Sequence, residues 1–517
     1  MSYFIGIDVG TGSARAGVFD ENGWLVSDSS EAITLYRPQV GRAEQSSAQI
    51  WKAICIAIQR ALSASSVAPR TVKALSFSAT CSLVLVGKQG SPVSLSHTEN
   101  DTDVVVWMDQ RAVDEAQEVN RTGHYVLESL GGQISPEMQV PKMMWLKRNR
   151  PELWEQLDYA GDLADYLTYR CTGRAERSIC TLVCKWTYDG EKDGWHEDFL
   201  STVGLSDLLS VANLPDKALK VGESIGYLTQ QAADDLGLTT GTLVTAGLID
   251  AHAGALGTVG TKSSNVEQYL ALIAGTSNCH LIMAKTAHPT PGVWGPYKHA
   301  IFPDYYLTEG GQSTTGAALD HVVNLFGIDD KLDESPHLVA GDLIYQRLID
   351  DIYFGSDVQV IPDFLGNRSP IASPELRAMI SGLTIEDPFE TFLKVYFATA
   401  KGIAYGTRMV IEQINHCGGD VQTIFLSGGH KKSPLLTELY ADVTGCRVVV
   451  SGCEEPVLLG AAISAMTPFE QTKDLIKTAA SVGQICGVYL PCPSRAEAYE
   501  RGYRSFLKHY EQATGAE

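Results

Sequence analysis

A strand–turn–strand signature at the start of the chain constrains its fold more than any other segment. Two apolar runs, at 3–9 and 14–19, flank a turn of sequence Gly-Thr-Gly-Ser at 10–13. Glycines let the backbone approach a ligand closely, and exposed N–H groups and hydroxyls in such a turn suit a phosphate. Asp8 precedes the turn, where a carboxylate suits Mg²⁺. An ordinary glycine turn in a hairpin would leave the same pattern, so both interpretations stay open.

Strand-like and helix-like runs alternate along the rest of the chain, which is typical of α/β layering. Ile50, Ile54, Ile58 and Leu62 repeat at helical spacing, and the longest helical pattern covers 390–414. A chain of 517 residues exceeds the size at which one core keeps growing. We therefore expect an α/β protein with at least two domains.

A second strand, Gly-Thr turn and strand occurs at 269–283, with its turn at Gly275-Thr276. Two such turns far apart in the sequence suggest a duplicated α/β unit with the active site between the copies. We place the boundary near residues 252–262, which gives one domain of 1–255 and another of 256–517.

The charge balance argues against two classes of partner. The chain has 40 Lys and Arg against 61 Asp and Glu, a formal charge of −21. This charge repels nucleic-acid backbones and anionic lipid, so neither partner is expected. The 11 cysteines are scattered, the first strand has no basic leader before it, and no apolar run has the length of a bilayer span. These features predict a cytoplasmic protein with reduced thiols.

Four later stretches carry polar and glycine residues at the ends of predicted strands or the starts of helices. They cover 245–254, 309–313, 426–434 and 457–462. Together with the first turn, and in this order, they resemble the FGGY carbohydrate kinases, which belong to the actin-like, Hsp70-like ATPase superfamily. The resemblance extends over nearly the whole chain.

The resemblance implies two actin-like (RNase H-like) α/β domains around a central cleft, and phosphorylation of a sugar hydroxyl by ATP with Mg²⁺. Asp250 matches the family's catalytic base, and Asp8 matches its Mg²⁺-associated aspartate. The nucleotide contacts implied by the family are Thr11, Gly12, Ser13, Arg15, Gly275, Thr276, Gly310, Gly311, Gln312, Gly428, Gly429 and Ser433.

The chemistry of phosphoryl transfer agrees with these roles, because it requires positioning, charge neutralisation and a group that accepts the hydroxyl proton. Asp250 follows a predicted strand and opens an Ala/Gly-rich helix, which would fix its carboxylate in the cleft. The alternatives are local: Asp250 as a helix N-cap, Asp8 as a turn-stabilising carboxylate, and Gly428-Gly429 as a plain loop. We expect His252 to be a structural residue of the helix.

Two segments are candidates for sugar binding by their place in the family. The expected contacts are Thr80, Cys81, Ser82, Trp107 and Asp109, together with Asp250. A typical xylulokinase has Gly-Gln-Met-His-Gly where this chain has Ala-Thr-Cys-Ser-Leu at 79–83. The Thr-Cys-Ser sequence at 80–82 instead resembles the motif of the D-ribulokinase branch. The alternatives are a buried indole for Trp107 and a surface ion pair between Asp109 and Arg111.

We therefore expect an ATP- and Mg²⁺-dependent ketopentose kinase that phosphorylates D-ribulose at its C5 hydroxyl. Xylulokinase, L-ribulokinase and ribitol kinase are the alternatives within the class, and a non-catalytic actin- or Hsp70-like nucleotide switch is the alternative outside it. A homodimer is compatible with the sequence, but no pattern selects an interface. The partly matched kinase signature near 141–147 leaves Glu137 and Lys142 without an assigned role. We expect Gly460 to allow close helix packing.

Overall fold

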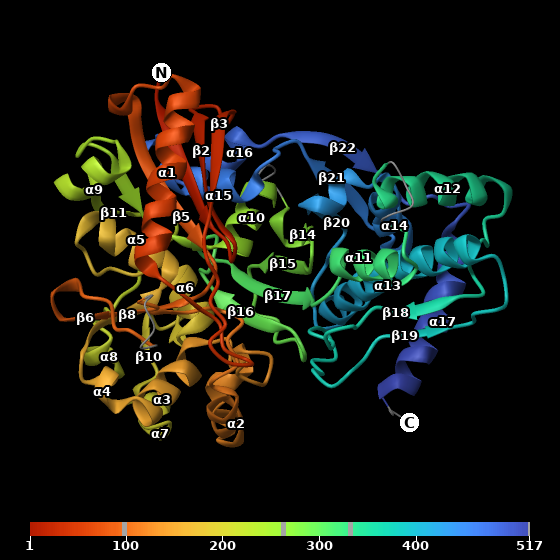
Figure 1. The fold of residues 1–517 in the computed structure, drawn as a ribbon, viewed down its shortest axis with the longest axis horizontal. Helices are drawn as coiled ribbons and strands as arrows, with labels where there is room; N and C mark the ends of the chain where they lie inside the picture. The colour runs from red at the N-terminus through yellow and green to blue at the C-terminus, as the bar shows by residue number, and fades with distance from the viewer. Residues whose placement is uncertain (96–100, 260–264, 329–333, 515–517) are drawn as a thin grey trace.

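Two seven-stranded sheets with the same order of strands form the two lobes of the molecule (Figure 1). This computed structural model describes residues 1–95, 101–259, 265–328 and 334–514. The first sheet runs β3-β2-β1-β5-β12-β11 and the second runs β17-β15-β14-β20-β21-β22, with β16 at its edge. In both orders two antiparallel pairings are followed by two parallel pairings and a final antiparallel one. The duplicated unit expected from the two turns is therefore present.

The elements follow the sequence patterns closely. The first sheet consists of β1 (Tyr3–Val9), β2 (Ser13–Asp20), β3 (Leu25–Ala32), β5 (Val72–Ala79), β11 (Ser224–Tyr227), β12 (Leu243–Thr245) and β13 (Leu248–Ile249). The second consists of β14 (Tyr269–Ala274), β15 (Asn278–Ala284), β16 (Trp294–Lys298), β17 (Tyr306–Gln312), β20 (Thr423–Ser427), β21 (Arg447–Ser451) and β22 (Ile485–Tyr489). The principal helices are α1 (Ser47–Ser65), α3 (Gln139–Asn149), α5 (Leu163–Thr172), α6 (Ile179–Lys185), α10 (Asp250–Val259), α11 (Gly316–Leu325), α12 (Pro336–Asp350), α13 (Pro388–His416), α14 (Pro434–Thr444), α15 (Pro456–Met466), α16 (Leu475–Val482) and α17 (Ala496–Thr514).

The alternation of side chains along β1 decides where its polar residue points. Ile5, Ile7 and Val9 are fully buried in the core shared with α1 and α5. Because successive side chains of a strand point to opposite faces, Gly6 and Asp8 share the other face. That face is covered by α15, which comes from the second half of the chain. The period of two therefore directs Asp8 toward the junction between the lobes.

The two helices at the junction, α10 and α15, are exchanged between the halves of the chain. α10 ends the first half and packs on β14 of the second sheet, whereas α15 packs on β1 and β5 of the first sheet. The helices touch through their backbones. A Cβ atom at Gly257 would lie 2.0 Å from the carbonyl oxygen of Pro456, and one at Gly460 would lie 1.8 Å from that of Ala253. The close packing expected of Gly460 is confirmed.

A methyl group at this contact should be costly. We expect Gly460→Ala to lower the free energy of unfolding by about 2–3 kcal/mol, since overpacking a well-packed core costs that much, and to lower the thermal midpoint accordingly. Gly341→Ala in α12 is the matched control, because a Cβ atom there meets nothing within 4 Å and alanine favours the helix. A Gly460→Ala protein that melts at or above the wild-type temperature would contradict the contact.

A second, smaller sheet lies in the first half of the chain. A four-stranded sheet runs through β4 (Glu44–Gln45), β7 (Val104–Val105), β6 (Leu83–Gly87) and β8 (Leu157–Asp162). Its strand β6 follows β5 in the chain, and the segment 80–82 connects the two. None of the helices within the described ranges is both long enough and apolar enough for a membrane crossing. The predicted boundary between 255 and 256 falls within α10 and stays a prediction, and residues 260–264 lie outside the described part.

Candidate active site

Asp250 stands at the start of α10, directly after the short strand β13 that pairs with β5. One carboxylate oxygen, Oδ1, accepts a hydrogen bond of 2.7 Å from the N–H of the next residue, Ala251. An N-cap side chain instead bonds an N–H two or three residues further on, so the contact does not match the capping alternative. Burial, together with the nearby Asp8 carboxylate, raises the pKa of Asp250 to about 6. A carboxylate with this pKa can take a proton from a hydroxyl near neutral pH.

Asp8 is held by side chains of the neighbouring strands β2 and β5 and not by the backbone of the first turn. Arg15, its partner across the β1–β2 hairpin, donates to Asp8 Oδ2 at 2.6 Å, and the Ser78 hydroxyl donates to Oδ1 at 3.2 Å. Arg15 also donates to Glu455 at 2.7 Å, immediately before α15. These partners do not match the interpretation of Asp8 as a turn-stabilising residue. They form a carboxylate–guanidinium–carboxylate chain across the junction of the lobes.

The first turn presents an open backbone. Gly10 closes the turn by donating to the Ser13 carbonyl at 3.0 Å, and Gly12 is exposed, with nothing within 4 Å of the position its Cβ would take. The indole N–H of Trp107 donates to the Thr11 hydroxyl at 3.0 Å. Trp107 is half-buried, and it links the turn to the predicted sugar segment.

The second turn and the Gly428-Gly429 loop lie side by side. Gly428 has φ = +84°, and a Cβ atom there would lie 2.3 Å from the Ala274 carbonyl oxygen at the end of β14. Gly275 and Gly429 have free space at their Cβ positions, and Thr276 is exposed. The fold thus joins two predicted nucleotide segments that are about 150 residues apart in the sequence, as the parallel pairing of β14 with β20 requires. Ser433 caps α14 by accepting from Leu436 N–H.

The segment 80–82 follows β5 and is fixed from several sides. The hydroxyls of Thr80 and Ser82 are hydrogen-bonded at 3.0 Å, and the backbone N–H of Trp107 donates to Ser82 Oγ at 3.2 Å. Gln139 donates to the Cys81 carbonyl at 3.0 Å. Lys142 donates to the carbonyls of the Trp107 segment, and burial lowers its pKa to about 8. Lys142 therefore fixes the Trp107 segment, which in turn bonds Ser82.

Three of the predicted residues are held in contacts that leave little capacity for a ligand. Asp109 is fully buried, its oxygens accept from Arg111 at 2.7 and 2.8 Å, and the N–H of Ala43 adds a third bond of 2.7 Å. The partner is the one named in the alternative, but the pair is buried and not at the surface as that alternative supposed. Gln312 bonds Asn278 and the Ile403 carbonyl within β17 and α13. Gly310 lies in the same strand against Val410. We do not include these residues in the site.

A set of charged residues from both halves of the chain, none of which received a role from the sequence, meets at the junction. Lys185 ends α6 with its ammonium 5.3 Å from the centre of the Trp294 ring, and the Arg368 guanidinium lies 4.6 Å from the same centre. Arg368 also lies 3.8 Å from Glu137, which gives that residue a place at the junction. Glu309 of β17 is 6% exposed. The motif stretch 309–313 contains Glu309, but no local pattern indicates that Lys185 and Arg368 lie near it, because the packing of α6 on β16 and the contacts to Trp294 arise from the tertiary fold.

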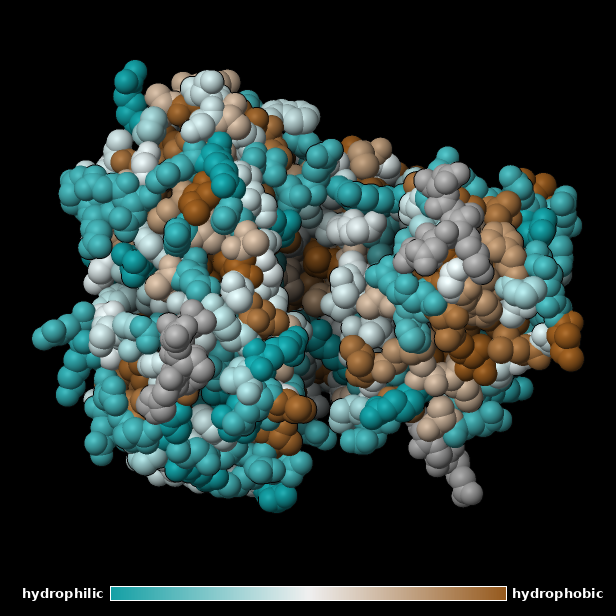
Figure 2. Space-filling model, in the orientation of Figure 1, coloured by the Kyte–Doolittle hydropathy of each residue, from teal (hydrophilic) through white to brown (hydrophobic). Residues whose placement is uncertain are grey.

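The charges act on one another and on Asp250. Burial alone would raise the pKa of Glu309, but the hydrogen bond from His252 and the positive charges of Lys185 and Arg368 lower it to about 2. The Glu309 charge raises the pKa of Asp250, and the Lys185 charge lowers it. The space-filling view shows a hollow between the two lobes (Figure 2). The carboxylates and cations are thus arranged to hold a polar molecule beside Asp250.

The fit of a Mg²⁺ ion can be judged from the donor set. Within the described residues no group of three or more His, Cys, Asp and Glu could hold a metal. Mg²⁺ in phosphoryl-transfer sites is usually held by one or two carboxylates together with phosphate oxygens and water. The Asp8 carboxylate, which also helps to raise the pKa of Asp250, fits that requirement.

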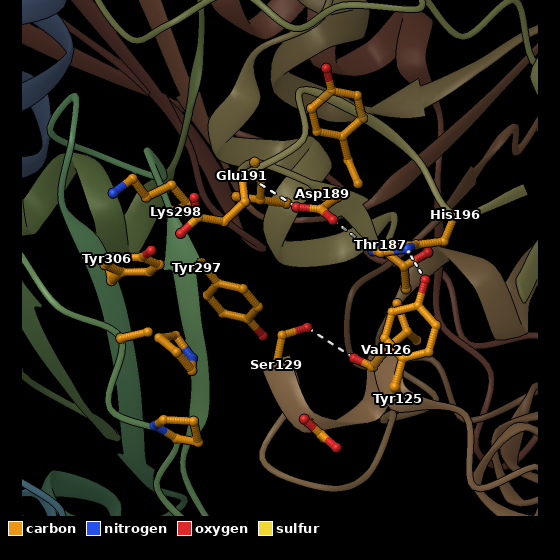
Figure 3. A pocket seen from close by; sticks show the side chains of 17 residues that line it. Tyr125, Val126, Ser129, Thr187, Asp189, Glu191, His196, Tyr297, Lys298 and Tyr306 are labelled. Atoms are coloured by element: carbon orange, nitrogen blue, oxygen red, sulfur yellow. Dashed lines mark hydrogen bonds and ion pairs between the residues drawn. The ribbon is translucent and has the colours of Figure 1, made fainter.

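A separate pocket of about 270 Å³ lies where η3 (Tyr125–Ser129) meets β16 and the segment after α6 (Figure 3). Its walls include the rings of Tyr188, Tyr297 and Tyr306. None of the residues predicted for the site lines it. We therefore place the candidate active site at the hollow between the lobes, around Asp250 and the first turn, and not in this pocket.

Comparisons with known proteins agree with this architecture. The model for the N-terminal domain of the FGGY family of carbohydrate kinases matches residues 3–257, and the model for the C-terminal domain matches 270–468. The chain is 37% identical over 530 residues to an FGGY carbohydrate kinase domain-containing protein of Homo sapiens, with 98% of this chain and 96% of that protein covered. It is 34% identical over 522 residues to a D-ribulokinase of Saccharomyces cerevisiae, with 91% and 73% covered.

Solved structures show the same fold. A xylulose kinase of Rhodospirillum rubrum superimposes with a TM-score of 0.82 at 21% identity, covering 99% of this chain and 98% of that chain. A glycerol kinase of Plasmodium falciparum with ADP gives 0.81 at 16% identity, with 98% of each chain covered. At these identities the likeness concerns the fold alone, and the predicted pair of actin-like domains is confirmed. The chain belongs to the FGGY family of carbohydrate kinases.

Proposed function

We propose that this carbohydrate kinase transfers the γ-phosphoryl group of ATP to the C5 hydroxyl of D-ribulose. The observation that carries the transfer is the place of Asp250, a partly buried carboxylate with a raised pKa beside Asp8 and the first turn. The relationship to a D-ribulokinase supports the choice of sugar. The sequence at 80–82, similar to that branch, supports it as well.

The proposed reaction follows from the residues. The oxygen of the sugar C5 hydroxyl bonds to the γ-phosphorus of ATP while Asp250 accepts the hydroxyl proton, and ADP leaves. Thr11, Gly12, Ser13 and Arg15 face the phosphates from the first turn. The nucleotide contacts proposed for the second lobe are Gly275, Thr276, Gly311, Gly428, Gly429 and Ser433. A Mg²⁺ ion at Asp8 would supply positive charge to the phosphate oxygens.

The sugar site we propose combines predicted and newly found residues. Ordered polar groups come from Thr80, Cys81 and Ser82, and Trp107 supplies an aromatic wall, as sugar sites commonly need. The buried Lys185 ammonium is a donor suited to the carbonyl oxygen of a ketose, and the Glu309 carboxylate is an acceptor suited to its hydroxyls. A pentitol lacks the carbonyl, so this arrangement favours a ketopentose.

A panel of acceptors tests the proposal. D-Ribulose, L-ribulose, D-xylulose and ribitol are compared in a coupled assay of ADP release. We expect kcat/KM for D-ribulose to exceed the others by roughly 10²-fold or more, because a site that hydrogen-bonds one arrangement of hydroxyls and carbonyl rejects analogues with another by leaving buried polar groups unpaired. A different preferred acceptor would replace D-ribulose, and slow ATP turnover unaffected by every sugar would favour the nucleotide switch.

The pH dependence of the reaction follows from Asp250. Burial and the Asp8 charge raise its pKa to about 6, and only the deprotonated form accepts a proton. We therefore expect kcat/KM for the sugar to rise with pH through about 6 and to level off above it. The measurement is the rate at saturating Mg·ATP from pH 5 to 8, with a check that the coupling enzymes are not limiting. A rate that is flat or falls across this interval would contradict Asp250 as the base.

A further inference from the structure

Behind the proposed sugar site three buried side chains form a hydrogen-bonded chain that joins the two halves of the molecule. Cys180 Sγ in α6 lies 3.1 Å from His252 Nδ1 in α10. His252 Nε2 in turn lies 3.4 Å from Glu309 Oε2 in β17. Cys180 and His252 are fully buried and Glu309 is 6% exposed. Neither Cys180 nor His252 has a role in the reaction described above.

The chemistry of the carboxylate fixes the direction of the bond between His252 and Glu309. An ionised carboxylate only accepts hydrogen bonds, so the Nε2 atom of His252 carries the proton that faces Glu309. In the tautomer that carries its one proton on Nε2, the Nδ1 atom is an acceptor, and the Cys180 thiol can donate to it. Burial raises the pKa of Cys180 well above its ordinary value, which keeps the thiol protonated. The backbone N–H of Ile249 donates to the sulfur at 3.5 Å.

Glu309 needs a hydrogen-bond donor to stay ionised, because it is buried among other titratable groups. Charged and titratable groups face it from every element around it: His252 and Asp250 of α10, Cys180, Cys184 and Lys185 of α6, Cys279 of β15, Tyr297 of β16, and Arg368. Burial favours the neutral acid, whereas the cations and the imidazole N–H favour the carboxylate. Of these favourable groups, His252 is the one whose hydrogen bond to Glu309 the structure shows.

We propose that His252, itself oriented by Cys180, is a positioning residue that holds the Glu309 carboxylate ionised and aimed at the hydroxyls of the bound sugar. The inference rests on the proposed function, since it takes Glu309 as a sugar contact. Because His252 lies two residues after Asp250 on α10, one helix would place both the proton acceptor and the hydroxyl acceptor. The sequence prediction of a purely structural His252 would then be incomplete.

Two substitutions at position 252 separate positioning from packing. His252→Leu removes the donor, whereas His252→Gln keeps an N–H near the place of Nε2. We expect His252→Leu to raise KM for the sugar by roughly 10- to 100-fold, the size expected for a lost hydrogen bond to a charged group, and to change KM for ATP less than twofold. His252→Gln should restore most of the sugar affinity.

The pH profile gives a readout that packing alone would not change. Without the imidazole donor the pKa of Glu309 rises, so sugar kcat/KM of His252→Leu should fall at low pH over a second, added titration. Cys180→Ala should show a smaller shift in the same direction, and Cys180→Ser, which keeps a donor, should remain near wild type. Cys184→Ala is the matched control, because Cys184 is a fully buried thiol one helical turn along α6.

The outcomes are distinguishable from failure of the proposed function. The kinetics use whichever acceptor the wild-type enzyme phosphorylates best. Carboxyl ¹³C NMR of glutamate-labelled protein, with the Glu309 signal assigned by its loss in Glu309→Gln, measures the same ionisation without any turnover. A signal that titrates at the same pH in wild type, His252→Leu and Cys180→Ala would overturn the inference, as would an unchanged sugar KM together with a lowered melting temperature. If His252→Leu does not fold, Cys180→Ala and His252→Gln carry the comparison.

Discussion

Asp250→Asn should lower kcat by roughly 10²- to 10⁴-fold, the contribution of a positioned general base. The amide has the same shape and its oxygen can still accept the bond from Ala251, so substrates should bind almost as before. It cannot take the proton of the sugar hydroxyl. The measurement is steady-state kinetics for both substrates, with binding of ATP and of the sugar followed separately by calorimetry.

A second buried aspartate provides the control for this substitution. Asp103 is also buried, its pKa is also raised to about 6 by burial, and its oxygens bond the N–H and hydroxyl of Ser47 away from the cleft. Asp103→Asn should change stability while kcat stays near wild type. An Asp250→Asn enzyme with kcat within about threefold of wild type would remove Asp250 from the role of base.

Asp8→Asn should be the second most damaging substitution, with a loss of roughly 10²- to 10³-fold in kcat/KM for ATP, the size reported for single groups that stabilise transition-state charge. The change removes the negative charge that faces the proposed Mg²⁺ ion and that pairs with Arg15 at 2.6 Å. The Mg²⁺ concentration at half-maximal rate should therefore rise. Titration of Mg²⁺ at fixed ATP measures it.

Arg15→Gln separates the two effects of that substitution. It breaks the pair with Asp8 and the bond to Glu455, yet it leaves the carboxylate in place. We expect weaker ATP binding with a Mg²⁺ midpoint close to that of the wild type. If Asp8→Asn leaves the Mg²⁺ midpoint unchanged, Asp8 holds Arg15 and not the metal.

Much of the framework could be predicted from local patterns. The apolar runs around the first turn, the helical spacing of Ile50 to Leu62 and the long pattern at 390–414 all correspond to observed elements, because their periodicity is set by short-range geometry. The repeat at 269–283 correctly predicted a duplicated unit. The order of motifs then led to the family, which the comparisons confirm.

The contents of the sugar site could not be predicted in this way. Glu309 lies in the motif stretch 309–313 but received no role there, Lys185 and Arg368 lie outside the four stretches, and the three residues meet only through tertiary packing. Asp109 is a site residue predicted from the family whose role stays a prediction. A family motif suggested a sugar contact, but the acid sits in a fully buried pair with Arg111, where the fixed fork of the guanidinium occupies its oxygens.

The exchange of α10 and α15 has a consequence for the independence of the two repeats. Each half of the chain lacks the helix that covers the inner face of its own sheet and receives it from the other half. A gene divided between α10 and β14 would encode two fragments, each with an uncovered apolar sheet face, that become soluble only when they are produced together. The repeats are separable in sequence, but they are obligate partners in folding.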